Sequence, residues 1–138
     1  MKIISTIFLI SIFLSAIAQS ENINFQTSSF AVSLSKEGNL TSIRDKLNGK
    51  DYIVENQSNP ILSISSNGNI ENPSSLRLNG DDLVLKYAEN NVETRIAVAK
   101  KGEYLTFELI EISPADKVEL VIWGPYHTQI KETVGESV

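Results

Sequence analysis

The chain has 138 residues, of which 41% are apolar and 21% are charged, and its formal net charge is −5. This length leaves room for one domain of ordinary soluble composition. The acidic balance argues against a nucleic-acid binder, because such proteins gain much of their affinity by neutralising phosphates. The absence of cysteine from the sequence excludes disulfide bonds and thiolate metal sites, so packing alone has to hold the fold together.

The start of the chain has the pattern of a secretory signal peptide. A short basic start precedes an almost unbroken apolar run at residues 3–15, and Ala16 and Ala18 are small residues at the positions that signal peptidase recognises. The run is shorter than the roughly 20 residues that a membrane-spanning helix needs. We therefore predict a signal peptide helix at residues 1–18, whose removal leaves a secreted or periplasmic chain of 120 residues without a membrane span.

Beyond this leader, apolar and polar residues alternate with a period of two, which is typical of strands that bury one face. The clearest stretches are residues 30–35, 83–88, 92–99, 104–110 and 118–123. Turn signals rich in glycine and asparagine separate them at residues 36–39, 47–50, 67–69, 79–82, 89–91 and 100–102. Such spacing predicts about eight to ten strands in an all-β antiparallel β-sandwich or barrel. We favour the sandwich, placed at residues 30–127.

Three segments depart from this regular pattern. Residues 19–29 are predicted as an N-terminal tether or an edge strand. Residues 67–75, rich in asparagine, serine and glycine, are predicted as a surface loop. Residues 128–138 contain apolar positions but no closing turn, and we interpret them as the start of a further, truncated element. On this interpretation the sandwich is incomplete and belongs to a longer protein; the alternative is a short protein with a frayed end.

One aromatic cluster near the C-terminus is the best candidate for a binding site. Trp123, Tyr126 and His127 surround a Gly-Pro turn that follows the last predicted strand. Indole and phenol faces stack on the C–H faces of sugars, and an imidazole adds a hydrogen bond or acts as a base. The structural alternative, which we favour for Trp123, is that it fills the sandwich core while Tyr126 covers its rim. A single histidine does not make a multi-histidine metal site.

The carboxylates do not form a convincing catalytic pair. Sugar hydrolysis usually needs two carboxylates in a defined arrangement. Glu108 and Glu111 are three residues apart, which places them on opposite faces of a regular strand. Glu132 and Glu136 would share a face. Acidic residues on turns and solvent-facing strands are more simply explained by solubility, so we predict no catalytic residue, no metal site and no cofactor.

The stretch FAVSLSKEGNLTSIRDKLNGKDY, residues 30–52, resembles the opening of galactose mutarotase-like supersandwich domains. The later strands and the closing VIWGPY, residues 121–126, suit the same architecture. Such domains commonly begin secreted bacterial glycoside hydrolases or accompany polysaccharide lyase domains. The resemblance implies a domain that packs on a downstream catalytic domain of the same chain and shapes its substrate cleft, without catalytic acids of its own.

Three hypotheses for function follow. The first is a non-catalytic carbohydrate-binding or substrate-positioning sandwich, which contacts a glycan or oligosaccharide through Trp123, Tyr126 and His127. The second is a structural or adhesion module with no sugar site. The third, a small enzyme that acts alone, requires a carboxylate pair or a histidine-centred site that the sequence does not display.

Overall fold

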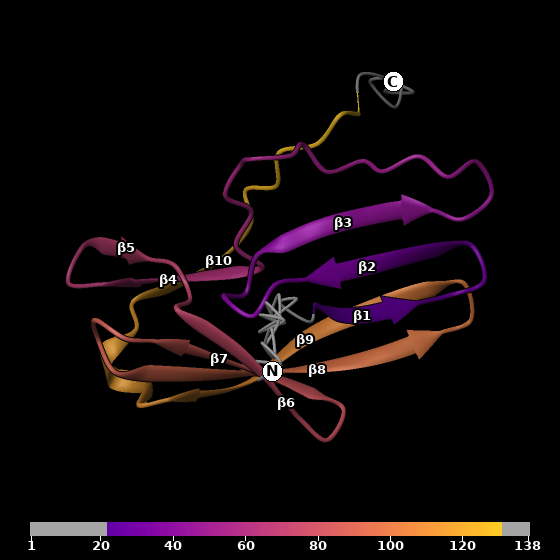
Figure 1. The fold of residues 1–138 in the computed structure, drawn as a ribbon. Helices are drawn as coiled ribbons and strands as arrows, with labels where there is room; N and C mark the ends of the chain where they lie inside the picture. The colour runs from indigo at the N-terminus through magenta and orange to yellow at the C-terminus, as the bar shows by residue number, and fades with distance from the viewer. Residues whose placement is uncertain (1–21, 131–138) are drawn as a thin grey trace, which may run out of the picture.

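A computed structural model describes residues 22–130, and this part of the chain consists mainly of strands (Figure 1). The predicted signal peptide and residues 131–138 lie outside it. The strands are β1 (Ile23–Gln26), β2 (Phe30–Leu34), β3 (Leu40–Asp45), β4 (Leu62–Ser66), β5 (Asn69–Glu71), β6 (Ser75–Asn79), β7 (Asp82–Tyr87), β8 (Val92–Lys101), β9 (Tyr104–Ser113) and β10 (Leu120–Trp123). A short 3₁₀ turn, η1 (Ala115–Lys117), precedes β10. The predicted all-β class is confirmed.

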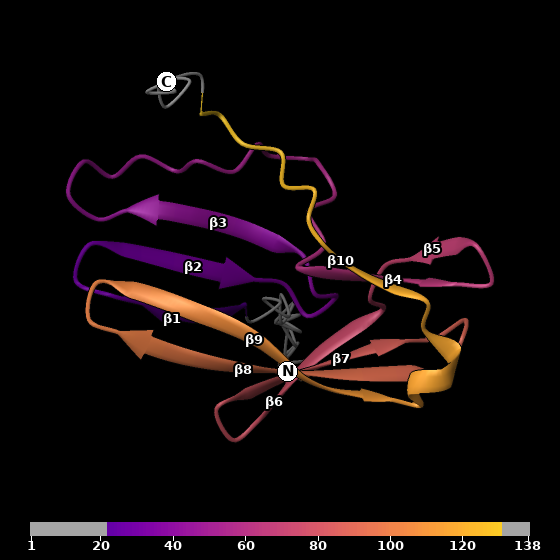
Figure 2. The same ribbon diagram turned by 180° about the vertical axis from the view of Figure 1, so that it is seen from behind.

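The strands form three antiparallel sheets, ordered β1-β2-β3, β10-β4-β5 and β6-β7-β8-β9. The four-stranded sheet forms one layer, and the two three-stranded sheets lie against it (Figures 1 and 2). Phe25 of β1 meets Phe107 of β9 edge to face, with ring centroids 6.0 Å apart. The Tyr87 hydroxyl of β7 donates a hydrogen bond of 2.9 Å to the Leu62 carbonyl of β4. These contacts tie the two layers together as an antiparallel β-sandwich.

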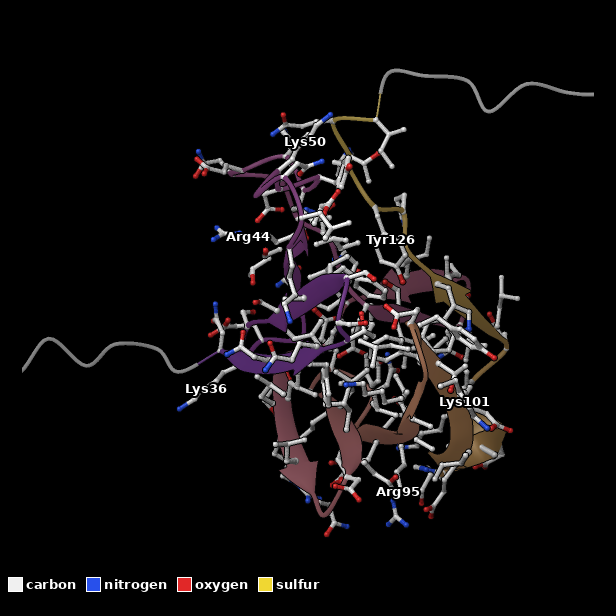
Figure 3. The ribbon with its side chains drawn as sticks, turned by 90° about the vertical axis from the view of Figure 1, so that its right-hand side faces the viewer. Lys36, Arg44, Lys50, Arg95, Lys101 and Tyr126 are labelled. Atoms are coloured by element: carbon white, nitrogen blue, oxygen red, sulfur yellow. The ribbon has the colours of Figure 1, made fainter. Side chains whose placement is uncertain are left out.

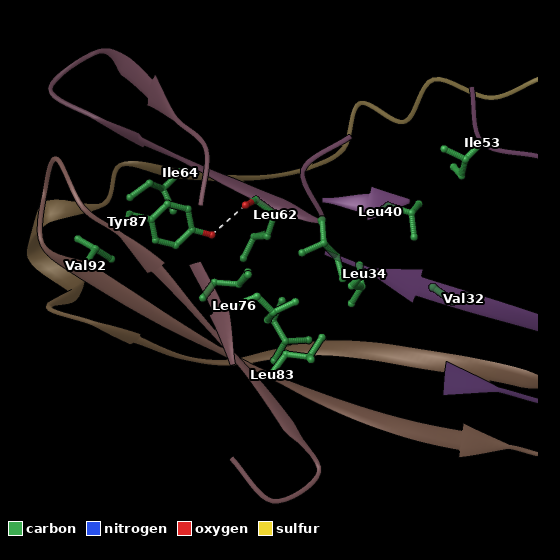
Figure 4. Packing of buried hydrophobic residues seen from close by; sticks show 13 residues of the cluster. Val32, Leu34, Leu40, Ile53, Leu62, Ile64, Leu76, Leu83, Tyr87 and Val92 are labelled. Carbon is green, nitrogen blue, oxygen red and sulfur yellow. Dashed lines mark hydrogen bonds between the residues drawn. The ribbon is translucent and has the colours of Figure 1, made fainter. Parts of the chain in front are cut away.

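The alternating pattern of the sequence decides which side of each strand faces inward. In β7, Leu83, Leu85 and Tyr87 are fully buried, whereas of the two intervening residues Lys86 is exposed and Val84 is also buried. In β8 the same alternation buries Val92, Thr94 and Ile96. These rows meet the inner residues of the opposite layer in one apolar core (Figure 4). The core consists of Val32, Leu34, Leu40, Ile53, Ile61, Leu62, Ile64, Leu76, Leu83, Leu85, Tyr87, Val92 and Ile96.

Several predicted turns join neighbouring strands as hairpins. Gly68 and Gly80 have positive φ in the β4–β5 and β6–β7 turns, and Asn91 has φ 51° before β8. Glycine and asparagine are the residues that most readily adopt this left-handed conformation. The turn at Gly49 returns residues 50–54 alongside β3, where the Asp45 amide donates to the Lys50 carbonyl at 2.8 Å. This returning segment pairs at an isolated bridge and forms no strand of its own.

For two segments the structure decides between predicted alternatives or contradicts the prediction. Residues 23–26 form the edge strand β1, the second of the two alternatives for that segment. Residues 67–75 were expected to be a loop, and this expectation is wrong, because they contain β5 and lead into β6. A tertiary contact explains the difference: the buried carboxylate of Glu71 accepts hydrogen bonds from the backbone amides of Glu89 (2.7 Å) and Asn90 (3.3 Å). The β4–β5 hairpin is thereby attached to the β7–β8 turn.

Removing the hydroxyl of Tyr87 is expected to destabilise the fold. In the Tyr87→Phe variant the buried Leu62 carbonyl loses its hydrogen-bond donor, which costs about 1–2 kcal/mol of unfolding free energy. Urea denaturation at neutral pH measures the loss. The matched change Tyr104→Phe, at a side chain that is 58% exposed, is expected to leave stability unchanged.

The same tyrosine is expected to make the fold sensitive to alkali. Burial raises the pKa of Tyr87 to about 12, above the value of about 10 for an exposed phenol. The protonated form is therefore favoured by folding, and its contribution is complete below pH of about 10 and is lost as pH rises through the folded pKa. Unfolding free energy should fall over this interval more steeply in the wild type than in Tyr87→Phe. Parallel alkaline curves would contradict this role.

Gly38 is expected to tolerate alanine less well than Gly80. Both have positive φ, at 82° and 64°. A Cβ on Gly38 would lie 2.8 Å from side-chain atoms of both Leu85 and Pro73, whereas one on Gly80 would meet no atom within 4 Å. We expect Gly80→Ala to cost about 1 kcal/mol from backbone strain alone and Gly38→Ala about 2–4 kcal/mol. Equal losses in thermal unfolding would show that the steric contact does not matter.

Candidate functional site

Trp123 lies at the rim of the sandwich, at the end of β10, where it pairs with Leu62 of β4. Its side chain is 42% exposed. The favoured expectation that Trp123 fills the core is therefore wrong. The chain turns directly after Trp123, at Gly124, which has a positive φ of 76°, and the indole remains at the surface.

The residues after Trp123 form an extended segment, residues 124–129, that we call the C-terminal strap. Figure 2 shows it running from the end of β10 past the segment that follows β3. The Tyr126 hydroxyl donates to the Ile61 carbonyl at 2.8 Å, and the His127 amide donates to the Asn59 side-chain oxygen at 2.6 Å. The Val54 amide in turn donates to the His127 carbonyl at 2.9 Å. The strap is thus fixed to residues 54–61 by backbone and side-chain hydrogen bonds.

The three predicted site residues are all exposed, Trp123 at the end of β10 and Tyr126 and His127 on the strap. Tyr126 is 38% exposed, and the labelled side chain in Figure 3 hangs from the strap towards the body of the sandwich. Burial of part of its ring raises the pKa of Tyr126, which keeps the phenol protonated and able to donate to Ile61. His127 is exposed, and its backbone rather than its imidazole holds the strap in place. The site therefore presents indole and phenol surface on a fixed backbone.

A hollow of mixed polar and apolar lining near the strap was not recognised from the sequence. It has a volume of about 270 Å³ and is lined mainly by the loop at residues 55–59 and by the start of β3. Asn59, which is almost fully buried, connects this hollow to His127 through the hydrogen bond already described. The run of asparagine and glutamine at residues 56–59 was the sequence signal that could have indicated this hollow. Amide side chains both donate and accept hydrogen bonds, as the hydroxyl groups of a sugar require.

The carboxylate pair of β9 also differs from expectation. Glu108 pairs with Ala97 of β8, and Glu111 pairs with Arg95, two residues away on the same strand. The two glutamates therefore share the outer face, whereas the sequence spacing predicted opposite faces. A β-bulge between these positions adds one residue to β9 and reverses the expected alternation. Glu111 also forms an ion pair with Arg95 at 3.4 Å. The second predicted pair, Glu132 and Glu136, lies outside the described residues.

Over residues 22–130, His, Asp and Glu side chains form no group of three or more that is arranged to hold a metal ion. No helix in that range is long and apolar enough to cross a membrane.

Comparison with known proteins finds no matching family model, no similar curated protein and no similar solved structure.

The exposure of Trp123 is expected to be visible in solution. It is the only tryptophan of the chain, so intrinsic fluorescence excited at long wavelength reports on this site alone. Because the indole is 42% exposed, acrylamide should quench the native protein efficiently, though less than the urea-unfolded chain. A Trp123→Phe variant provides the background signal. Emission that resists quenching until the protein unfolds would contradict the placement of this residue at the rim.

Proposed function

We propose that this protein is a non-catalytic carbohydrate-binding or substrate-positioning β-sandwich. It acts outside the cytoplasm, in the periplasm or after secretion. It is the N-terminal part of an exported glycan-degrading enzyme, related to galactose mutarotase-like domains. In this proposal a downstream catalytic domain of the same polypeptide cleaves the glycan, and the sandwich holds it. No catalytic residue is assigned to this segment.

The observation that carries the proposal is the partial exposure of Trp123 and Tyr126 on a strap that is fixed by hydrogen bonds. Exposed aromatic side chains offer flat apolar faces, and sugars present apolar C–H faces that match them. A fixed backbone lowers the entropy lost when the ligand binds. The amide-rich hollow beside His127 adds polar groups that suit the hydroxyl groups of the same ligand.

Binding by this site alone is expected to be weak. Each aromatic contact contributes about 1 kcal/mol beyond the buried area, so an affinity near the millimolar range is appropriate for one short oligosaccharide. This strength suits a domain that keeps a polymer near a catalytic domain, because several weak contacts along one chain add through effective concentration.

Titration with glycans tests the proposal. We expect one of three probes, a galactoside, a linear glucan or a uronic-acid polymer, to shift the Trp123 emission and to protect it from acrylamide. Trp123→Ala should weaken binding, measured by calorimetry or ligand-observed NMR, by about fivefold or more, since about 1 kcal/mol is lost. Tyr104→Ala removes a more exposed aromatic side chain at the β8–β9 turn and should have no effect.

A flat response to every glycan would reject the sugar site and favour the second candidate, a structural or adhesion module. The specific observation behind that candidate is the apolar surface on strand edges, which includes Ile70 of β5, Leu78 of β6 and Leu120 of β10.

A further inference from the structure

The free edge of β9 differs from every other sheet edge in the described part of the chain. β9 has ten residues and pairs only with β8, so the backbone groups on its other side have no strand partner there. The remaining edge strands β1, β5, β6 and β10 have three to five residues each. β3 is followed along its free edge by residues 50–54. Long unpaired edges are sites at which another strand adds to a sheet.

The first six residues of β9 form a regular template for such pairing. From Tyr104 to Leu109 the register with β8 is continuous, and the β-bulge comes only after Leu109. Six residues is an ordinary strand length. Neither proline nor lysine, which often protect natural edges, occurs in this stretch.

The inner side of the same stretch is not fully covered. Leu105, Phe107 and Leu109 face the core and pack against it, but each remains partly exposed. Leu85 of β7 and Ile96 of β8, the partner of Leu109, are completely buried, whereas Val98 of β8, the partner of Phe107, is partly buried. The inner apolar residues are thus completely buried on β7 and only partly buried along residues 105–109 of β9. A strand added at this edge would cover the exposed apolar row with inward side chains of its own.

The outer side of the stretch carries a single charged residue, Glu108, beside Tyr104 and Thr106. Glu108 lies opposite the small side chain of Ala97 and has no ion-pair partner among residues 22–130. Glu111 is already paired with Arg95. In an antiparallel pair, opposite charges directly across from each other are favourable and like charges are unfavourable. The position across the free edge from Glu108 therefore selects lysine or arginine.

We propose that residues 104–109 of β9 dock an extended strand of a partner protein, apolar at alternate positions and basic between them. The partner adds a fifth strand beyond β9. Its apolar side chains cover Leu105, Phe107 and Leu109, and its cation faces Glu108. This docking surface is independent of the aromatic site, and it goes beyond the proposed binding of glycans.

Two synthetic nine-residue peptides with blocked ends test the surface. In one, isoleucine alternates with lysine, and in the other, isoleucine alternates with glutamate. Fluorescence anisotropy at moderate salt should show that the lysine peptide binds about fivefold or more tightly than the glutamate peptide, the size of one favourable cross-strand charge pair. Hydrogen exchange measured by mass spectrometry should show added protection in β9.

Charge reversal separates specific docking from general attraction to an acidic protein. Glu108→Lys should reverse the preference, so that the glutamate peptide binds more tightly. Asp81→Lys makes the same change of charge in the exposed β6–β7 turn and should keep the original preference. Circular dichroism verifies that both variants are folded. If Glu108→Lys does not fold, the hydrogen exchange of β9 in the wild type, with and without the lysine peptide, provides the readout.

Three results would overturn the proposal. The first is that neither peptide binds. The second is that both variants shift the preference equally, or that protection appears at an edge other than β9. The third is that the protein dimerises through β9 without peptide, which would make a second copy the occupant. Glycan titration of the same samples measures a different surface. A negative result for strand docking therefore does not reject glycan binding, and the reverse also holds.

Discussion

Packing between the two layers of the sandwich is the constraint on which the other features depend. The Tyr87–Leu62 hydrogen bond and the Phe25–Phe107 contact connect strands that belong to three different sheets. No disulfide is available to replace these contacts, because the chain has no cysteine. The burial of apolar rows therefore supplies most of the free energy that holds the sheets together. The strap and the β9 edge keep their positions only because this core is stable.

The candidate sugar site is built on the edge of that core rather than in a cavity. The strap carries Tyr126 and His127, and it is anchored to Asn59 and Ile61, next to core strand β4. A surface fixed in this way keeps its aromatic side chains in place without burying them. Such an arrangement suits a ligand that is long and polar with apolar faces. It is also consistent with weak binding, since little of the ligand is enclosed.

The β9 edge shows the opposite arrangement, in which apolar side chains belong to the core but are only partly covered. The strap follows the end of a strand, and the second surface is the free edge of a strand. They differ in chemistry: the strap presents aromatic rings, whereas β9 presents backbone groups without a strand partner and the carboxylate of Glu108. The two surfaces therefore suit different ligands, a glycan and a strand.

The sequence by itself determined the strand class, most turns and the inward rows of β7 and β8, because these depend on local alternation and on residues that favour positive φ. It also identified the aromatic cluster, although it did not predict the exposure of Trp123. Only the tertiary structure decided that Glu108 and Glu111 share a face, because a bulge is set by pairing with β8. The same holds for β5, which depends on the distant contact of Glu71 with the β7–β8 turn. Such features arise from contacts between residues far apart in the chain, which a local pattern does not encode.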